Sequence, residues 1–145
     1  MESAELKEFI LKTISEYGTK VSDPGGTKTR EFPLRVDPHK FYADFAFRIS
    51  SNKSWLFVED DEGQSATSNA SKYWYWIKTN KIAEAVHLVH IIGPSYGSHK
   101  RLAQFVSDEA RSQFPNFEYH QIVTESWDDP KWMDLFKQEI RSILM

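Results

Sequence analysis

Apolar residues follow two different periodicities along the chain, and together these predict its elements. Helical spacing of three and four residues occurs in four stretches, and the alternation or short apolar run typical of strands occurs in four others. The expected helices are 1–18, 71–80, 98–114 and 130–145, and the expected strands are 41–49, 55–61, 85–92 and 116–123.

The two central strands form a predicted antiparallel hairpin. FYADFAFRI (41–49) alternates and is aromatic, SSNKS supplies turn residues, and WLFVEDD (55–61) returns as the second strand. Ahead of them, the Pro- and Gly-rich stretch 22–40 contains a short alternation that suggests an irregular edge strand. Ser68 or Asn69 is expected to cap the helix that carries SKYWYWIKTN.

The order of these elements predicts the fold class. Helix, two or three strands, helix, strand, helix, strand and helix is the order of an α/β protein, in which helices flank a mixed sheet. The 145 residues (1–145) are expected to form a single domain, because the length suits one domain and no convincing linker interrupts the pattern.

Composition excludes several classes. Hydrophobic residues make up 40% and charged residues 27%, which is globular, and the absence of cysteine excludes disulfides and thiolate metal sites. The start lacks the features of a signal peptide, and no apolar stretch reaches membrane-spanning length, so we expect a cytoplasmic protein with no membrane partner. A net charge of −3 argues mildly against a nonspecific nucleic-acid coat, although a local basic groove remains compatible with it.

Four adjacent acids, residues 59–62, follow the second hairpin strand, and a further acid, Asp44, interrupts the apolar run of the first. Alternation places Glu59 and Asp61 on one face of their strand and Asp60 on the other. An unpaired buried Asp44 would be costly, but two neighbouring strands can bring Asp44 and Glu59 close enough to share a divalent ion. Oxygen ligands of this kind suit Mg²⁺ or Mn²⁺.

These residues resemble the PD-(D/E)xK nuclease superfamily, which has the restriction-endonuclease-like fold. Asp44 matches the metal-binding Asp of the motif and Glu59 matches its (D/E), while Asp61 stands where the motif has lysine. Some members carry that lysine on the next helix, and Lys72 lies at such a position. The order Glu59, Asp61, Gln64, Asn69, Lys72, Tyr73, Trp74 is similar to one branch of the superfamily, and the resemblance covers roughly two thirds of the chain.

The resemblance implies a single-domain restriction-endonuclease-like core and a Mg²⁺- or Mn²⁺-dependent nuclease that acts on DNA. Asp44, Glu59 and Asp61 are the implied metal ligands, and with Lys72 they are the candidate catalytic residues. In the family, bound cations polarise the phosphodiester and activate water, while the lysine orients that water or offsets transition-state charge.

Other residues are candidates for supporting roles. Gln64 and Asn69 are candidates for contacts to nucleic acid, as are Lys100 and Arg101, which open a predicted helix. Some relatives add a glutamate from the opening helix as an outer metal contact, and Glu5 or Glu8 could serve.

Several alternatives stay open. Asp61 in the lysine position also fits a nuclease-like module that binds nucleic acid or protein without cleaving it. Asp60 and Glu62 are expected to be solvated turn acids, and Tyr73, Trp74 and Trp76 to lie in the core. His87 and His90 fall on opposite faces of their strand, and a homodimer or larger complex supported by Trp127 or Trp132 is possible.

Overall fold

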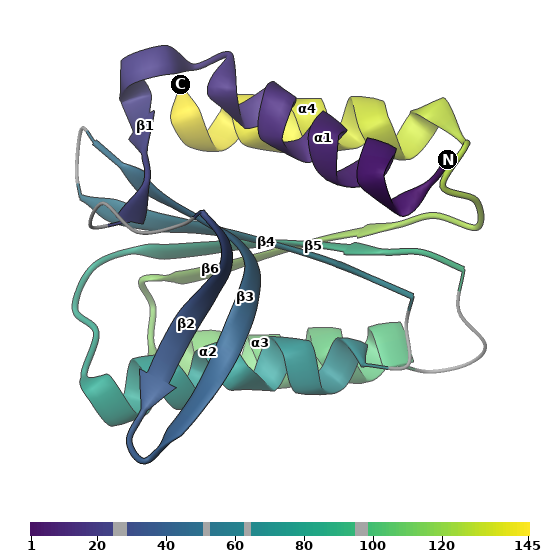
Figure 1. Ribbon diagram of the computed structural model, residues 1–145. Helices are drawn as coiled ribbons and strands as arrows, with labels where there is room; N and C mark the ends of the chain where they lie inside the picture. The colour runs from purple at the N-terminus through teal and green to yellow at the C-terminus, as the bar shows by residue number, and fades with distance from the viewer. Residues whose placement is uncertain (25–28, 51–52, 63–64, 95–98) are drawn as a thin grey trace.

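The computed structural model describes residues 1–24, 29–50, 53–62, 65–94 and 99–145. These ranges hold four α-helices and six strands, and a short 3₁₀ turn, Gly18–Lys20, follows the first helix (Figure 1). Four strands stand between the first two helices, where two or three were expected, and the rest of the order is as predicted. The elements are α1 (Ser3–Ser15), β1 (Val21–Ser22), β2 (Arg30–Val36), β3 (His39–Ile49), β4 (Ser54–Asp61), α2 (Ala66–Asn80), β5 (Val86–Ile92), α3 (His99–Gln113), β6 (Phe117–Val123) and α4 (Pro130–Leu144).

The strands form one mixed sheet, as predicted. Its order is β1-β3-β4-β5-β6, and β2 also pairs with β3. The pairs that involve β1, β2 and β3 are antiparallel, whereas β4, β5 and β6 run parallel to one another. The parallel half accounts for the nearly continuous apolar runs in β4 and β5, because both faces of these strands are covered.

Helices cover both faces of the sheet in three layers, with α1 and α4 on one side and α2 and α3 on the other (Figure 1). Alternation along β4 decides which side chains meet which helices: Leu56 and Val58 join the core under α1 and α4, and Phe57 joins the core under α2. Glu59 therefore lies on the α2 side and Asp60 on the α1 side.

The long strand β3 leaves the sheet at Asp44. It pairs with β4 only from Phe45 to Ile49 and with β2 from His39 to Phe45. Its first half therefore curves away with β2 and reaches α2 (Figure 1), where Asn80 Nδ2 donates to the Arg35 carbonyl at 2.8 Å. We call the point of separation, between Asp44 and Glu59, the strand fork.

One sequence-based expectation is wrong. Helix α2 begins at Ala66 with Ser65 as its N-cap residue, so Ser68 and Asn69 lie inside the first turn instead of capping the helix. The Asn69 amide already donates to the Ser65 carbonyl at 2.8 Å. Of the two tryptophans named for a possible dimer contact, Trp132 is buried against Phe9, and Trp127 is partly buried on the same core.

No helix in the described ranges is both long enough and apolar enough to cross a membrane.

Candidate active site

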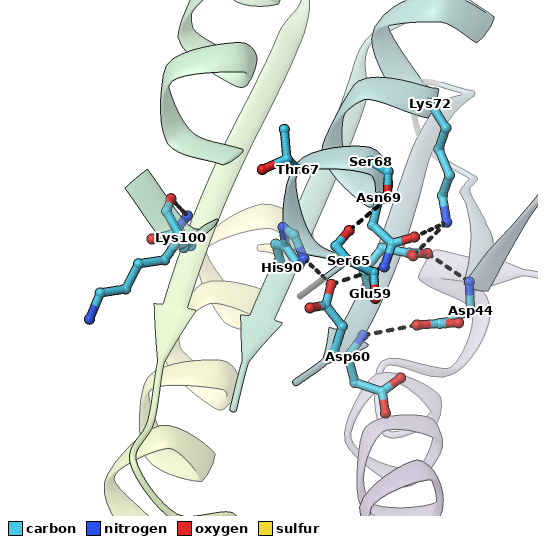
Figure 2. A network of polar contacts seen from close by, with 12 residues as sticks. Asp44, Glu59, Asp60, Ser65, Thr67, Ser68, Asn69, Lys72, His90 and Lys100 are labelled. Atoms are coloured by element: carbon cyan, nitrogen blue, oxygen red, sulfur yellow. Dashed lines mark hydrogen bonds and ion pairs between the residues drawn. The ribbon is translucent and has the colours of Figure 1, made fainter. Parts of the chain in front are cut away.

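The strand fork brings Asp44 and Glu59 together, as the sequence predicts. Once β3 and β4 stop pairing, the backbone amides at the fork need other acceptors. The amide of Asp44 donates to Glu59 Oε2 at 2.7 Å, and the amide of Asp60 donates to Asp44 Oδ2 at 3.0 Å (Figure 2). The two carboxylates thus replace the missing bonds between the strands and hold the fork at a fixed opening.

Glu59 is fully buried and accepts hydrogen bonds from three groups. Besides the Asp44 amide, these are Lys72 Nζ at 2.6 Å from Oε1 and the Tyr73 hydroxyl at 2.7 Å from Oε2. Burial raises the pKa of Glu59 to about 7, and the Lys72 ammonium opposes that rise while the charge of Asp44 adds to it. A buried carboxylate beside a second carboxylate is the environment that an added cation would relieve.

Lys72 points into the site from α2, and its side chain is only 9% exposed. Its ammonium group has three protons and finds three acceptors: Glu59 Oε1, the carbonyl of Tyr42 at 2.6 Å and Asn69 Oδ1 at 3.1 Å. Asn69 lies one helical turn before Lys72, so both project from the same side of α2. The predicted approach of a helix lysine to Glu59 is present.

Asp61 faces a chain of polar groups beneath α2 and α3. His90 Nε2 lies 2.6 Å from Asp61 Oδ2, and Asn69 Nδ2 donates to the same oxygen at 3.0 Å. On the other side, His90 Nδ1 lies 2.8 Å from the Tyr119 hydroxyl, which accepts from Gln121 Nε2 at 3.0 Å. We call Gln121, Tyr119, His90, Asp61 and Asn69 the polar chain.

Hydrogen-bond chemistry sets the direction of this polar chain. The Asp61 carboxylate can only accept, so Nε2 of His90 carries a proton and donates it to Asp61. The Tyr119 oxygen accepts from Gln121, which leaves the Tyr119 hydroxyl proton to donate to Nδ1 of His90. The amide of Asn69 is likewise oriented: its nitrogen faces Asp61 and its oxygen faces Lys72. Asp61 therefore reaches Lys72 through Asn69, so Asp61 has a structural task.

Asp60 is not the solvated turn acid that the sequence suggested. Its side chain is 8% exposed, lies on the α1 side of the sheet, and pairs with Lys7 Nζ at 3.5 Å. Burial and then the charge of Asp44 raise the pKa of Asp60 to about 7, with Lys7 opposing, and Asp60 Oδ1 is buried without a hydrogen-bond partner. Glu62 is exposed, as expected.

The remaining candidates lie elsewhere. Figure 2 shows the Lys100 side chain directed away from the strand fork, and it is the Lys100 carbonyl that takes part, accepting from Gln121 Nε2 at 2.9 Å. Arg101 is exposed at the start of α3. Glu5 and Glu8 are also exposed, so α1 brings Lys7 to the site and not a glutamate. Gln64 lies outside the described residues.

Tyr73 and Trp76 belong to the core, as expected, and His87 and His90 do lie on opposite faces of β5. Sequence reasoning missed Lys7, Asp60, His90, Tyr119 and Gln121 as neighbours of the site. A signal existed for Asp60, since alternation alone places it on the α1 face. For His90, Tyr119 and Gln121 the parallel register of β4, β5 and β6 provides the information, and for Lys7 the packing of α1 across the sheet does so.

The residues at the fork fit a cation that needs few protein ligands. Among the described residues, no cluster of three or more His, Asp or Glu side chains is arranged to hold a metal ion. Mg²⁺ is commonly bound by one or two carboxylates, with water and phosphate oxygens completing its shell, and this chemistry matches Asp44 and Glu59. Burial raises the pKa of both Glu59 and Asp60, the charge of Asp44 adds to the rise in each, and Asp60 Oδ1 is buried without a hydrogen-bond partner.

Comparisons of the chain with models of known protein families, with curated proteins and with solved structures found no match.

The first prediction concerns pH. Glu59 and Asp60 have folded-state pKa values near 7, above the 4.5 and 3.8 of the unfolded chain, so the folded state binds more protons between these limits. Stability should therefore fall as pH rises from about 4.5 to 8. For Glu59 the loss is on the order of 3 kcal/mol, at about 1.4 kcal/mol per pKa unit.

Urea unfolding in chelator at pH 5 and pH 8 measures this slope. Glu59→Gln should reduce it, and Glu62→Gln, which removes an exposed acid from the same run, should leave it unchanged. Equal slopes in wild type and Glu59→Gln would contradict the assignment.

The second prediction concerns the polar chain. Asp61→Val and His90→Leu each leave a buried polar partner unsatisfied, so each should destabilise the protein by about 1–3 kcal/mol. The double variant should lose less than the sum, with a coupling of about 0.5–3 kcal/mol. A matched cycle of Asp61→Val with His87→Leu, on the opposite face of β5, should be additive. Additivity in both cycles would show that the contact between Asp61 and His90 contributes nothing to the free energy of unfolding.

Proposed function

We propose that the chain is a divalent-metal-dependent phosphodiesterase that cleaves DNA, with a core of the restriction-endonuclease-like type. The observation that carries this proposal is the approach of Lys72 to Glu59 at the strand fork, 2.6 Å away, with Asp44 on the adjoining strand. Two strand carboxylates and a lysine delivered from the following helix are the set that the motif resemblance implies.

Each residue has a distinct task in this proposal. Asp44 and Glu59 would hold the cation, which when bound supplies Lewis-acid polarisation of the phosphodiester and a lowered pKa for water. Lys72 places a positive charge beside them, where it can stabilise charge that develops on the phosphate oxygens. Tyr73 and the Asp44 amide fix the Glu59 carboxylate, and burial of the site excludes bulk water from these contacts.

Asn69 and Asp61 act as positioning residues. Asn69 accepts from Lys72 and is held in that orientation by Asp61, which His90 holds in turn. In this proposal Asp61 supports the lysine through Asn69 and does not serve as a third metal ligand. This differs from the role that the motif alignment gives to Asp61.

One observation favours the second candidate, a nuclease-like module that binds nucleic acid or protein without cleaving it. All three protons of the Lys72 ammonium are matched by acceptors within the protein. A lysine held in this way serves as a structural ion pair unless one bond is released to water or phosphate. Activity measurements distinguish the two candidates.

Cleavage of supercoiled plasmid and of single-stranded DNA with Mg²⁺ or Mn²⁺ is the third prediction. Wild type should cut, and chelator should stop it. Glu59→Gln and Lys72→Ala should each reduce the rate by about 10²- to 10³-fold, the loss typical of removing one group that stabilises transition-state charge. Lys78→Ala is the matched control, because Lys78 is an exposed cation in the last turn of the same helix.

Absence of cutting by pure wild type with either cation would support the binding module. Cutting that survives Glu59→Gln would contradict the proposed site.

A further inference from the structure

An open groove adjoins the strand fork on the α2 and α3 side. It has a volume of about 730 Å³, within the usual range for small-molecule sites. Its walls come from the curved start of β3, the outer face of α2 and the first turn of α3. We call it the α2–α3 groove; its described lining residues are Phe41, Thr67, Ser68, Ser71, Lys72, Tyr75, His99 and Leu102.

The groove has an apolar floor with aromatic character. Tyr75 is 45% exposed and meets Phe41 edge to face, with ring centroids 6.0 Å apart. Leu102, from α3, is 47% exposed on the opposite wall. A flat ring entering between these side chains would cover apolar surface that now faces solvent.

The polar groups of the groove favour an anionic ligand with hydrogen-bonding edges. None of its described lining residues is acidic, while Lys72 carries a positive charge and the imidazole of His99 can form hydrogen bonds. Ser68 and Ser71 line one side, and because each hydroxyl already donates to a carbonyl of α2 or of its N-cap residue, its oxygen is available to accept a hydrogen bond from a ligand.

Lys72 connects the groove to the proposed reaction centre. It lines the α2–α3 groove and also lies 2.6 Å from Glu59 Oε1. A nucleic acid with a phosphate at the strand fork would therefore place a neighbouring nucleotide beside Tyr75. Inside a duplex the flat faces of the bases are covered by their neighbours, so only an unpaired base can stack on a ring in this groove.

We propose that the α2–α3 groove binds an unpaired nucleotide by stacking its base on Tyr75, which makes single-stranded nucleic acid the preferred substrate class. This inference rests on the proposed function, because it uses the fork as the place of the phosphate. It adds a binding site and a substrate preference that the motif residues do not specify.

Binding in chelator separates this inference from catalysis. The probe is fluorescein-labelled single-stranded dT12, compared by anisotropy with a 12-base-pair duplex. Wild type should bind the single strand at least about 10-fold more tightly. Tyr75→Ala should weaken single-strand binding by about 10- to 100-fold, as loss of one stacking ring does, and Tyr75→Phe should restore it.

Phe105→Ala is the matched control, because Phe105 is an exposed aromatic of α3, 55% exposed, outside the groove lining. It should leave binding unchanged. If the wild type binds the single strand but does not cleave DNA, this inference stands and the nuclease proposal fails. If the wild type cleaves DNA and Tyr75→Ala binds the single strand as tightly as wild type, the nuclease proposal stands and this inference fails.

Two other outcomes overturn the inference. Duplex binding equal to single-strand binding would remove the stated preference. A homodimer in sedimentation that Tyr75→Ala dissociates, together with no binding of dT12, would assign the groove to contact between two copies of the chain.

Discussion

Burial of the Glu59 carboxylate is the constraint on which the arrangement of this protein depends. An anion at a fully buried position is costly unless it is paired and hydrogen-bonded. Two elements supply what Glu59 on β4 needs: β3 provides the Asp44 amide, and α2 provides Lys72 and Tyr73. Because β3 separates from β4, the Asp44 amide is free to donate to Glu59. The shape of the sheet and the hydrogen bonding of this acid therefore depend on each other.

The placement of α2 follows from the same constraint. Helix α2 begins at Ala66. Lys72 and Tyr73 follow Asn69 by three and four residues, so the three side chains lie on one side of the helix and face β4. Asn69 links the two acids of this face, since it bonds Lys72 on one side and Asp61 on the other. The polar chain then extends across β5 and β6 to the Lys100 carbonyl, so it connects the start of α3 to the fork.

Local pattern was sufficient to predict the element types, the mixed sheet and the acids that meet at the fork. Periodicity predicts α1, α3 and α4, and alternation predicts that Glu59 and Asp60 face opposite layers. The helix start was wrong because Ser65, Ser68 and Asn69 are all residues that favour capping, and local preference does not choose between them. Nuclease activity, the cation and DNA as a partner remain predictions.

The contacts that local pattern missed depend on long-range geometry. The pairing of Asp61 with His90 requires the parallel register of β4 and β5, in which Glu59 lies opposite His90. Asp61 and His90 are 29 residues apart in the sequence, so no short stretch of it encodes their contact. Lys7 reaches Asp60 only because α1 packs across the sheet, and nothing in the sequence of α1 distinguishes this lysine from the other lysine of the helix, Lys12.

Three carboxyl groups and two lysines thus meet where the sheet opens, with Asp60 and Lys7 on the side opposite Glu59 and Lys72. Direct measurement of Mn²⁺ binding to the pure protein, by electron paramagnetic resonance at pH 8, tests most directly whether Asp44 and Glu59 hold a cation. We expect Mn²⁺ to bind wild type and Glu62→Gln alike and to lose its affinity for Asp44→Asn and Glu59→Gln. No binding to wild type, or equal binding to all four proteins, would contradict the assignment.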